Sequence, residues 1–267
     1  MLYDSFNRKI DYLRLSVTDR CNFRCTYCMP EEGVPFIPHH EVMSFEEIHT
    51  AVQTAVSLGV RKVRLTGGEP LVRRGIVELV AMLSEIEGIE DLAMTSNGAL
   101  LSEMAGPLKK AGLQRVNVSL DSLDPQRYRK ITRKGELQDV LDGIFAAREA
   151  GLFPIKLNTV IPPNGDKSEA QHVAEFGKEH GFQVRFIRQM DLSSGEFSVV
   201  EGGEGGNCPL CNRLRLSSRG IIYPCLFSDS GYDTRSLGVE EALRAAVGEK
   251  PARGIVSNSN TFYGIGG

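Results

Sequence analysis

Short apolar and β-branched runs alternate with longer amphipathic stretches over residues 12–190 of this 267-residue chain. The amphipathic stretches repeat apolar residues at the spacing of one helix face, and the short runs have strand length. This alternation predicts repeated βα units and a parallel sheet. Strands are expected at residues 13–17, 62–66, 92–95, 115–120, 155–161 and 183–187.

The first amphipathic stretch illustrates the helix signals. Ser44 and Glu47 have the spacing of a capping box, and Gly59 ends the apolar stripe that follows. Further helices are expected at residues 74–87, 102–111, 136–150, 168–180 and 239–247. Six βα units are too few for a closed barrel of eight. We therefore expect an α/β fold, an open, partial (βα)6 TIM-like barrel with its chemistry at the C-terminal strand ends.

The periodicity ends after Met190 in a Gly-rich stretch. We divide the chain into a barrel at residues 1–190, a flexible link at 191–207 and a small C-terminal cluster-binding segment at 208–267. The closing sequence TFYGIGG is too rich in glycine for a regular element, so neither helix nor strand is expected there.

The bulk composition narrows the classes of partner. With a net charge of -3, the chain has no overall attraction for nucleic acid or membranes, so an anionic ligand requires a local group of cations. No stretch has the length and apolarity of a membrane span or leader, and a cytoplasmic protein is expected. In such a chain, six cysteines favour metal-binding thiols over disulfides.

Three cysteines directly follow the first predicted strand: Cys21, Cys25 and Cys28, in the pattern C-x3-C-x2-C. Three thiolates leave one iron of a 4Fe-4S cluster open to a small molecule, whereas structural zinc usually takes four ligands. A zinc knot or incidental thiols are the alternative. The sequence GGEP at 67–70 ends the second strand at the same edge, where paired glycines let a ligand approach the backbone; a plain turn is the alternative there.

Found together and in this order, the two motifs resemble the radical S-adenosylmethionine (SAM) superfamily. The resemblance implies that SAM binds the open iron, and that an electron from the cluster cleaves SAM to a 5'-deoxyadenosyl radical. The protein would hold a substrate hydrogen beside that radical and exclude water.

A second cysteine set lies in the C-terminal segment: Cys208, Cys211 and Cys225, spaced C-x2-C-x13-C with no histidine between them. This again predicts a cluster with three thiolates, and zinc with a distant fourth ligand is the alternative. Arg213 and Arg215 are two residues apart, so their side chains lie on the same face beside the cluster if the chain there is extended. The alternative is that both arginines lie on a solvent-exposed face.

Motifs along nearly the whole chain resemble the GTP 3',8-cyclase family of molybdenum cofactor biosynthesis (molybdenum cofactor biosynthesis protein A), of which this chain looks like a shortened member. The motifs are YLRLSVTDRCNFRCTYCMP, RKVRLTGGEPLVRR, TSNG, RVNVSLD, CNRLRLSSRG, PCLFSD and the terminal GG.

The resemblance implies two sets of site residues and two 4Fe-4S clusters. Around SAM it implies Tyr27, Gly68, Ser119 and Met190. Around GTP it implies Arg14, Arg64, Thr95, Lys156, Arg213 and Arg215, with Arg213 and Arg215 also catalytic beside the cluster cysteines. The second open iron would bind guanine. Independently of the resemblance, Arg14, Arg64 and Lys156 lie in or beside three predicted strands, and burying their charges together inside a barrel costs free energy unless an anion is present. Separate salt bridges with Asp or Glu are the alternative.

The implied reaction removes hydrogen from C3' of GTP, and the carbon radical attacks C8 to give 3',8-cyclo-7,8-dihydro-GTP. The second cluster or nearby arginines would help quench the resulting aminyl radical. The implied partners are an electron donor such as ferredoxin or flavodoxin and, downstream, cyclic pyranopterin monophosphate synthase. The GG tail would reach into the active site.

Two features depart from the family pattern. The link before Cys208 is short where the family has a longer structured segment, so we expect a more open pocket, or one completed by a partner subunit in a homodimer. Arg188 stands where the family usually has an acidic residue, and it would bind phosphate or pair with Asp191 or Glu196.

Two other functions fit the cysteine motifs. One is a radical SAM enzyme acting on a peptide or on another nucleotide or pterin; a peptide gives no reason for the arginine and lysine set. The other is a non-catalytic iron–sulfur or zinc protein, against which the GGEP motif argues.

Overall fold

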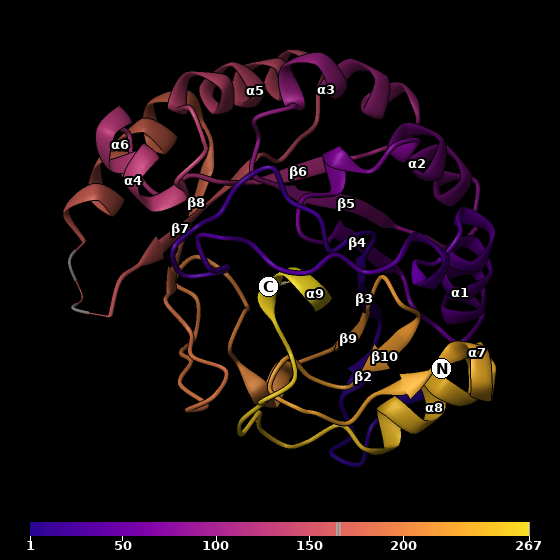
Figure 1. The fold of residues 1–267 in the computed structure, drawn as a ribbon. Helices are drawn as coiled ribbons and strands as arrows, with labels where there is room; N and C mark the ends of the chain where they lie inside the picture. Colours follow the sequence, from indigo (N-terminus) through magenta and orange to yellow (C-terminus); the bar gives the residue numbers. More distant parts are fainter. Residues whose placement is uncertain (164, 166, 267) are drawn as a thin grey trace.

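The computed structural model describes every residue except Asn164, Asp166 and Gly267. Six parallel strands lie side by side in chain order, with helices along their outer face (Figure 1). The strands are β3 (Tyr12–Ser16), β4 (Lys62–Thr66), β5 (Asp91–Ser96), β6 (Arg115–Ser119), β7 (Lys156–Ile161) and β8 (Gln183–Arg188). The outer helices include α1 (Phe45–Ser57), α2 (Ile76–Ser84), α3 (Leu101–Lys110), α5 (Leu137–Glu149) and α6 (Ser168–His180). This confirms the expected α/β fold with a partial barrel.

Helix starts follow local capping signals. The capping box of α1 is present, since the Ser44 hydroxyl accepts a hydrogen bond from the Glu47 amide at 3.1 Å, and the Glu47 carboxylate accepts one from the Ser44 amide at 2.7 Å. Helix α4 (Pro125–Thr132) was not predicted from the sequence. Its signals were present, because Asp124 caps the helix and Pro125 occupies its first turn.

The barrel strands are apolar on one face only. Leu13 and Leu15 are buried against the helices, while Tyr12 and Arg14 alternate with them and line the interior. In register, Arg14 lies opposite Arg64 on one neighbouring strand. The barrel thus encloses polar and cationic side chains.

The C-terminal segment extends the same sheet. β9 (Arg213–Leu216) pairs in parallel with β3, and β10 (Ile221–Tyr223) and β11 (Tyr232–Asp233) continue the sheet antiparallel, so that the sheet has nine strands among the described residues. α7 (Thr234–Leu237) and α8 (Val239–Gly248) follow, and α8 contacts α1. An N-terminal hairpin of β1 (Leu2–Tyr3) and β2 (Lys9–Ile10) contacts α8. Short 3-10 turns occur at His39–Glu41, Pro70–Val72 and Cys208–Leu210.

The link and the tail both have local structure. Backbone bridges join Phe186 to Glu201 and Asp191 to Glu196, which fold the link back against β8. The expectation of no helix in the tail was wrong for α9 (Phe262–Ile265), a single turn that the Thr261 hydroxyl caps at the Gly264 amide. Figure 1 shows α9 near the middle of the barrel. The last glycine, Gly267, lies outside the described residues.

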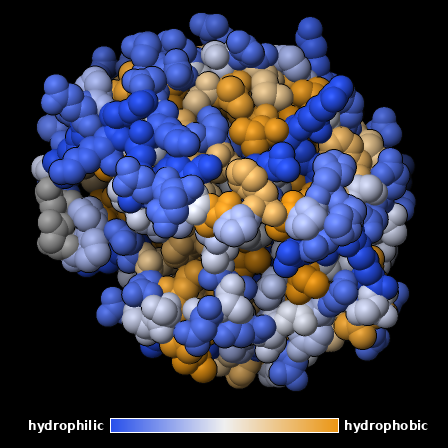
Figure 2. Space-filling view, viewed as in Figure 1, coloured by the Kyte–Doolittle hydropathy of each residue, from blue (hydrophilic) through white to orange (hydrophobic). Residues whose placement is uncertain are grey.

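Hydrophilic side chains cover much of the rim in the same view, and more hydrophobic ones lie toward its middle (Figure 2). Within the part of the chain that the structure describes, no helix has both the length and the apolar character needed to cross a membrane.

Candidate functional site

Two adjoining cavities occupy the barrel interior. Cys21, Cys25 and Cys28 line one of them. Cys208, Cys211 and Cys225 line the other. Asn158, Ile187 and Met190 line both, so the two cysteine sets open onto neighbouring space. All six cysteines are free thiols.

The first cysteine set lies in the loop that follows β3. The loop turns tightly, because the Cys28 amide donates a hydrogen bond to the Cys25 carbonyl at 2.9 Å. Burial raises the pKa of Cys21 to about 11 and that of Cys28 to about 12. These thiols therefore keep their protons at neutral pH unless a metal centre binds the sulfur atoms and displaces the protons. Three buried thiols facing one cavity fit an iron–sulfur cluster.

The first glycines of GGEP hold this loop against the end of β4. The Gly68 amide donates to the Thr18 carbonyl at 2.7 Å. A Cβ at Gly68 would lie 2.3 Å from the Arg20 carbonyl oxygen, and one at Gly67 would lie 2.5 Å from that of Thr18. Only glycine permits this approach of backbone to backbone.

Glu69 joins β4 to the end of β5. Its buried carboxylate accepts hydrogen bonds from the Ser96 hydroxyl at 2.9 Å and the Asn97 amide at 2.6 Å. It also accepts one from the Leu71 amide at 3.0 Å. Burial nevertheless raises the pKa of Glu69 to about 7. Glu69 and Asn97 lie in the motifs GGEP and TSNG, but no role was predicted for either residue.

The four residues implied for SAM come together around the first cavity, since Tyr27, Gly68, Ser119 and Met190 all line it. The Tyr27 hydroxyl donates to the Asp121 carboxylate at 2.7 Å, and Asp121 accepts a second bond from the Val160 amide at 2.8 Å. Burial raises the pKa of Asp121. Asp121, in the RVNVSLD motif, had no assigned role before the structure.

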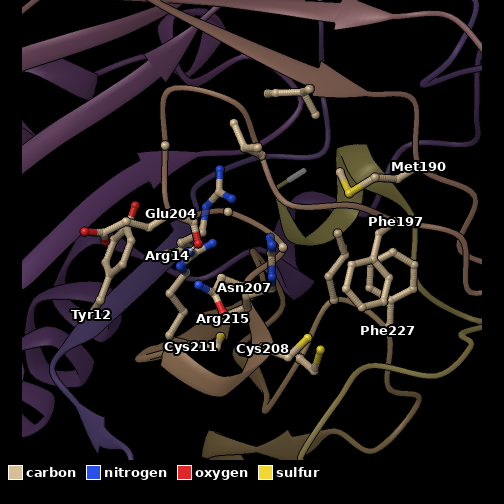
Figure 3. Close-up of a pocket in the computed structure, with 18 of the residues that line it drawn as sticks. Tyr12, Arg14, Met190, Phe197, Glu204, Asn207, Cys208, Cys211, Arg215 and Phe227 are labelled. Carbon is tan, nitrogen blue, oxygen red and sulfur yellow. Dashed lines mark hydrogen bonds between the residues drawn. The ribbon is translucent and has the colours of Figure 1, made fainter. Parts of the chain in front are cut away.

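The second cavity is lined by arginines from three neighbouring strands: Arg14, Arg64, Arg213 and Arg215 (Figure 3). Burial lowers the pKa of Arg64 and lowers that of Arg215 to about 10. The Arg64 guanidinium lies 5.2 Å from the centroid of the Tyr12 ring. Among the described residues, the buried Nε atoms of Arg64 and Arg213 have no hydrogen-bond partner, which suits an anionic ligand.

Two residues implied for GTP lie elsewhere. Thr95 lines the first cavity, and its buried hydroxyl finds no partner within the described parts of the chain. Lys156 lies outside the lining of both cavities, near Arg64 and Arg115, and burial followed by repulsion from Arg185 lowers its pKa to about 8. Arg185, which lines the second cavity, was not predicted as a site residue, although it lies in the predicted strand at residues 183–187.

The second cysteine set combines three thiols with nearby cations. Burial alone would raise the pKa of Cys211, but Lys250 and Arg213 lower it overall. Sulfur ligands alone favour soft metals and iron–sulfur clusters. No group of three or more His, Cys, Asp or Glu side chains in residues 1–163, 165 or 167–266 is arranged around a single ion.

The link and the tail close parts of the interior. Phe197 of the link lines the second cavity and packs on Phe227, with ring centroids 4.5 Å apart. Arg215 donates to the Ile265 carbonyl at 3.3 Å and to the Gly266 carbonyl. A Cβ at Gly266 would lie 2.1 Å from the Thr66 hydroxyl oxygen. Glycine is therefore the residue that fits at this point of the tail.

Arg188 lines the first cavity and is exposed. No ion pair joins it to Asp191 or Glu196 within the described residues. The Asp191 carboxylate instead accepts hydrogen bonds from Ser193 and Ser194.

A family model of the radical SAM superfamily matches residues 15–177. The GTP 3',8-cyclase of Thermodesulfovibrio yellowstonii is 42% identical over 280 positions, covering 88% of this chain and 87% of that protein. The GTP 3',8-cyclase of Petrotoga mobilis is 39% identical over 314 positions, covering 98% of this chain and 95% of its own. Because 314 aligned positions exceed 267 residues, at least 47 have no residue here.

Solved structures share the fold at low identity. Streptococcus suis SuiB bound to precursor peptide SuiA has a TM-score of 0.69 and 15% identity, covering 93% of this chain and 66% of that one. The enzyme anSMEcpe with bound AdoMet has a TM-score of 0.63 and 14% identity, covering 91% of this chain and 82% of its own. At such identity the likeness concerns the fold alone.

Proposed function

The chain belongs to the radical SAM superfamily and, within it, to the GTP 3',8-cyclase family, and we propose that it converts GTP to 3',8-cyclo-7,8-dihydro-GTP in molybdenum cofactor biosynthesis. As a radical SAM enzyme it uses a 4Fe-4S cluster and SAM. One observation carries the proposal on substrate. A cavity with three thiols adjoins a second cavity that combines three more thiols with buried arginines.

The first cavity suits SAM. A cluster held by Cys21, Cys25 and Cys28 supplies, when present, the electron that cleaves SAM to a 5'-deoxyadenosyl radical. Tyr27 and Ser119 line the proposed SAM site from two different parts of the chain. The hydrogen bond from Tyr27 to Asp121 fixes the orientation of the tyrosine ring. Met190 lines both cavities, so it would lie beside SAM and the substrate ribose and limit the access of water to the radical.

The second cavity suits a triphosphate. Arg64, Arg213 and Arg215 line this cavity from β4 and β9, and burial of several like charges is costly unless an anion neutralises them. Arg14 of β3 lines it too, whereas Lys156 of β7 lies outside its lining, so the contact of Lys156 with GTP stays a prediction. Within the described chain, no carboxylate pairs with Arg64, which argues against separate salt bridges as its purpose. Thr95 would hydrogen-bond the nucleotide from β5.

We assign a second 4Fe-4S cluster to Cys208, Cys211 and Cys225, where three thiolates leave a position for the guanine base. Arg213 and Arg215 flank this position from β9. Their guanidinium groups would hydrogen-bond the base there and stabilise negative charge on it. The Gly266 end of the tail holds Arg215 through backbone carbonyls.

The wider assignments follow from this chemistry. A ferredoxin or flavodoxin supplies electrons, and cyclic pyranopterin monophosphate synthase takes the product. The cytoplasmic location, the homodimer, the phosphate-binding role of Arg188 and the lack of partners among nucleic acids and membranes stay predictions.

A radical SAM enzyme acting on a peptide is the second candidate, because SuiB, one of the fold neighbours, is bound to a precursor peptide. The buried arginines disfavour it, since a peptide supplies no cluster of negative charges for them. Anaerobic reconstitution, reduction and addition of SAM with GTP separates the two. We expect 5'-deoxyadenosine together with a cyclised nucleotide, and neither from Cys21→Ala. If 5'-deoxyadenosine forms at the same rate without GTP and no GTP is consumed, GTP is the wrong substrate.

A further inference from the structure

Lys250 is a buried lysine beside the second cysteine set. It follows α8, and only 3% of its surface is exposed. Its ammonium donates hydrogen bonds to the carbonyls of Arg213 and Pro224, each at 2.7 Å. Arg213 lies two residues after Cys211, and Pro224 directly precedes Cys225. One ammonium thus ties together the two chain segments that carry these cysteines.

The charge of Lys250 has no carboxylate partner. Throughout the described parts of the chain, no Asp or Glu lies within ion-pair distance of it. Lys250 lines the same cavity as Cys211 and Cys225; burial lowers its pKa, and charge interactions with these two thiols oppose that shift. A buried ammonium without a counter-charge is costly. The sulfur atoms of this site are the groups available to supply that charge.

A nearby arginine provides a useful contrast. Arg8 contacts the same site through the Cys208 carbonyl at 2.8 Å. Its charge is already neutralised, because its Nε lies 2.6 Å from the buried Asp4 carboxylate. Arg8 therefore serves as a structural tie to the N-terminal hairpin, whereas Lys250 carries an uncompensated positive charge.

We propose that Lys250 is the counter-ion of the second cysteine site, positioning Cys211 and Cys225 and raising the reduction potential of the cluster that they hold. The inference rests on the two-cluster part of the proposed function. Three thiolates leave a 4Fe-4S centre negatively charged, and reduction adds a further negative charge. A buried cation beside the cluster stabilises the reduced form more than the oxidised form.

The test uses the full chain with Cys21, Cys25 and Cys28 changed to Ser, so that the remaining iron signal comes from the second site. Into this parent we introduce Lys250→Met, which removes the charge but keeps much of the side chain, and Lys250→Arg, which keeps the charge. Lys178→Met, at an exposed position of α6, is the matched control. Each protein is reconstituted anaerobically and analysed for iron, labile sulfide and the midpoint potential of its EPR signal.

We expect Lys250→Met to shift the midpoint to a more negative potential and to speed iron loss to a chelator severalfold. Lys250→Arg and Lys178→Met should stay near the parent. An unchanged midpoint in Lys250→Met at equal iron content would overturn the inference. If Lys250→Met binds no iron, the Lys250→Arg variant decides. Iron uptake by Lys250→Arg would support the role of the charge, and a failure of Lys250→Arg to bind iron would refute that role. A parent without a cluster would instead contradict the two-cluster proposal itself.

Discussion

The backbone of Gly68 packs against the carbonyl oxygen of Arg20, so closely that a Cβ on Gly68 would lie 2.3 Å from that oxygen. The amide of the next residue, Glu69, donates to the same oxygen at 2.8 Å. Arg20 directly precedes Cys21. The glycine motif therefore fixes the position at which the cysteine loop leaves the barrel.

We predict that Gly68→Ala weakens the first metal centre. The methyl group has to push the cysteine loop away, so the variant should retain at most about half of the parent's iron at this site, with a loss of stability of about 1–3 kcal/mol. Gly106→Ala is the matched control, because nothing lies within 4 Å of a Cβ there and the residue lies inside α3. The control should gain up to about 1 kcal/mol. Iron content and urea unfolding of both variants check this, and full iron binding by Gly68→Ala would contradict it.

The buried carboxyl of Glu69 predicts a pH dependence of stability. Its pKa is raised from 4.5 to about 7 in the folded chain, so the folded state binds the proton more tightly than the unfolded state. The contribution of Glu69 to the free energy of unfolding is fully present below about pH 4.5. It decreases as the pH rises toward 7, by up to about 1.4 kcal/mol per pH unit.

Urea unfolding of the apoprotein between pH 5 and pH 8 tests this, with Glu69→Gln as the comparison. The free-energy difference between wild type and Glu69→Gln should fall as pH rises through the window. A difference that stays constant across these pH values would show that Glu69 does not titrate there.

Replacing Arg64 should weaken GTP binding and at the same time stabilise the nucleotide-free protein. We predict that Arg64→Met weakens GTP binding about tenfold to a hundredfold, because a charge-assisted hydrogen bond contributes about 1.5–3 kcal/mol. The same change should stabilise the nucleotide-free protein, since it removes a buried charge that lacks a carboxylate partner among the described residues. Equilibrium binding and thermal unfolding measure the two effects. Arg244→Met, at an exposed arginine paired with Glu240, should change neither by much.

The tail glycine predicts a loss of activity without a loss of folding. In Gly266→Ala the added methyl would meet the Thr66 hydroxyl at 2.1 Å, so the tail has to withdraw from Arg215. We expect GTP turnover to fall at least about tenfold. Gly248→Ala serves as the control, because a Cβ there meets nothing within 4 Å. Unchanged turnover in Gly266→Ala would show that the position of the tail does not matter.

The barrel strands and most helices were predictable because their signals are local. Short apolar and β-branched runs marked the strands, a helical spacing of apolar residues marked the helices, and the capping box of Ser44 formed as expected. The pairing of β9 with β3 was not predictable, since residues two hundred positions apart leave no local pattern. The same applies to Lys250, whose burial and place beside the second cysteine set depend wholly on tertiary packing. The missed helix α4 is different, because the Asp124–Pro125 start signal was present and overlooked.

Transfer of hydrogen from the substrate tests the central claim most directly. The reconstituted enzyme is reduced and given SAM with GTP that carries deuterium at C3', and the 5'-deoxyadenosine is analysed by mass spectrometry. The account predicts that 5'-deoxyadenosine gains one deuterium for each GTP cyclised. Unlabelled 5'-deoxyadenosine formed in step with GTP consumption would contradict it, because the hydrogen would then come from another position.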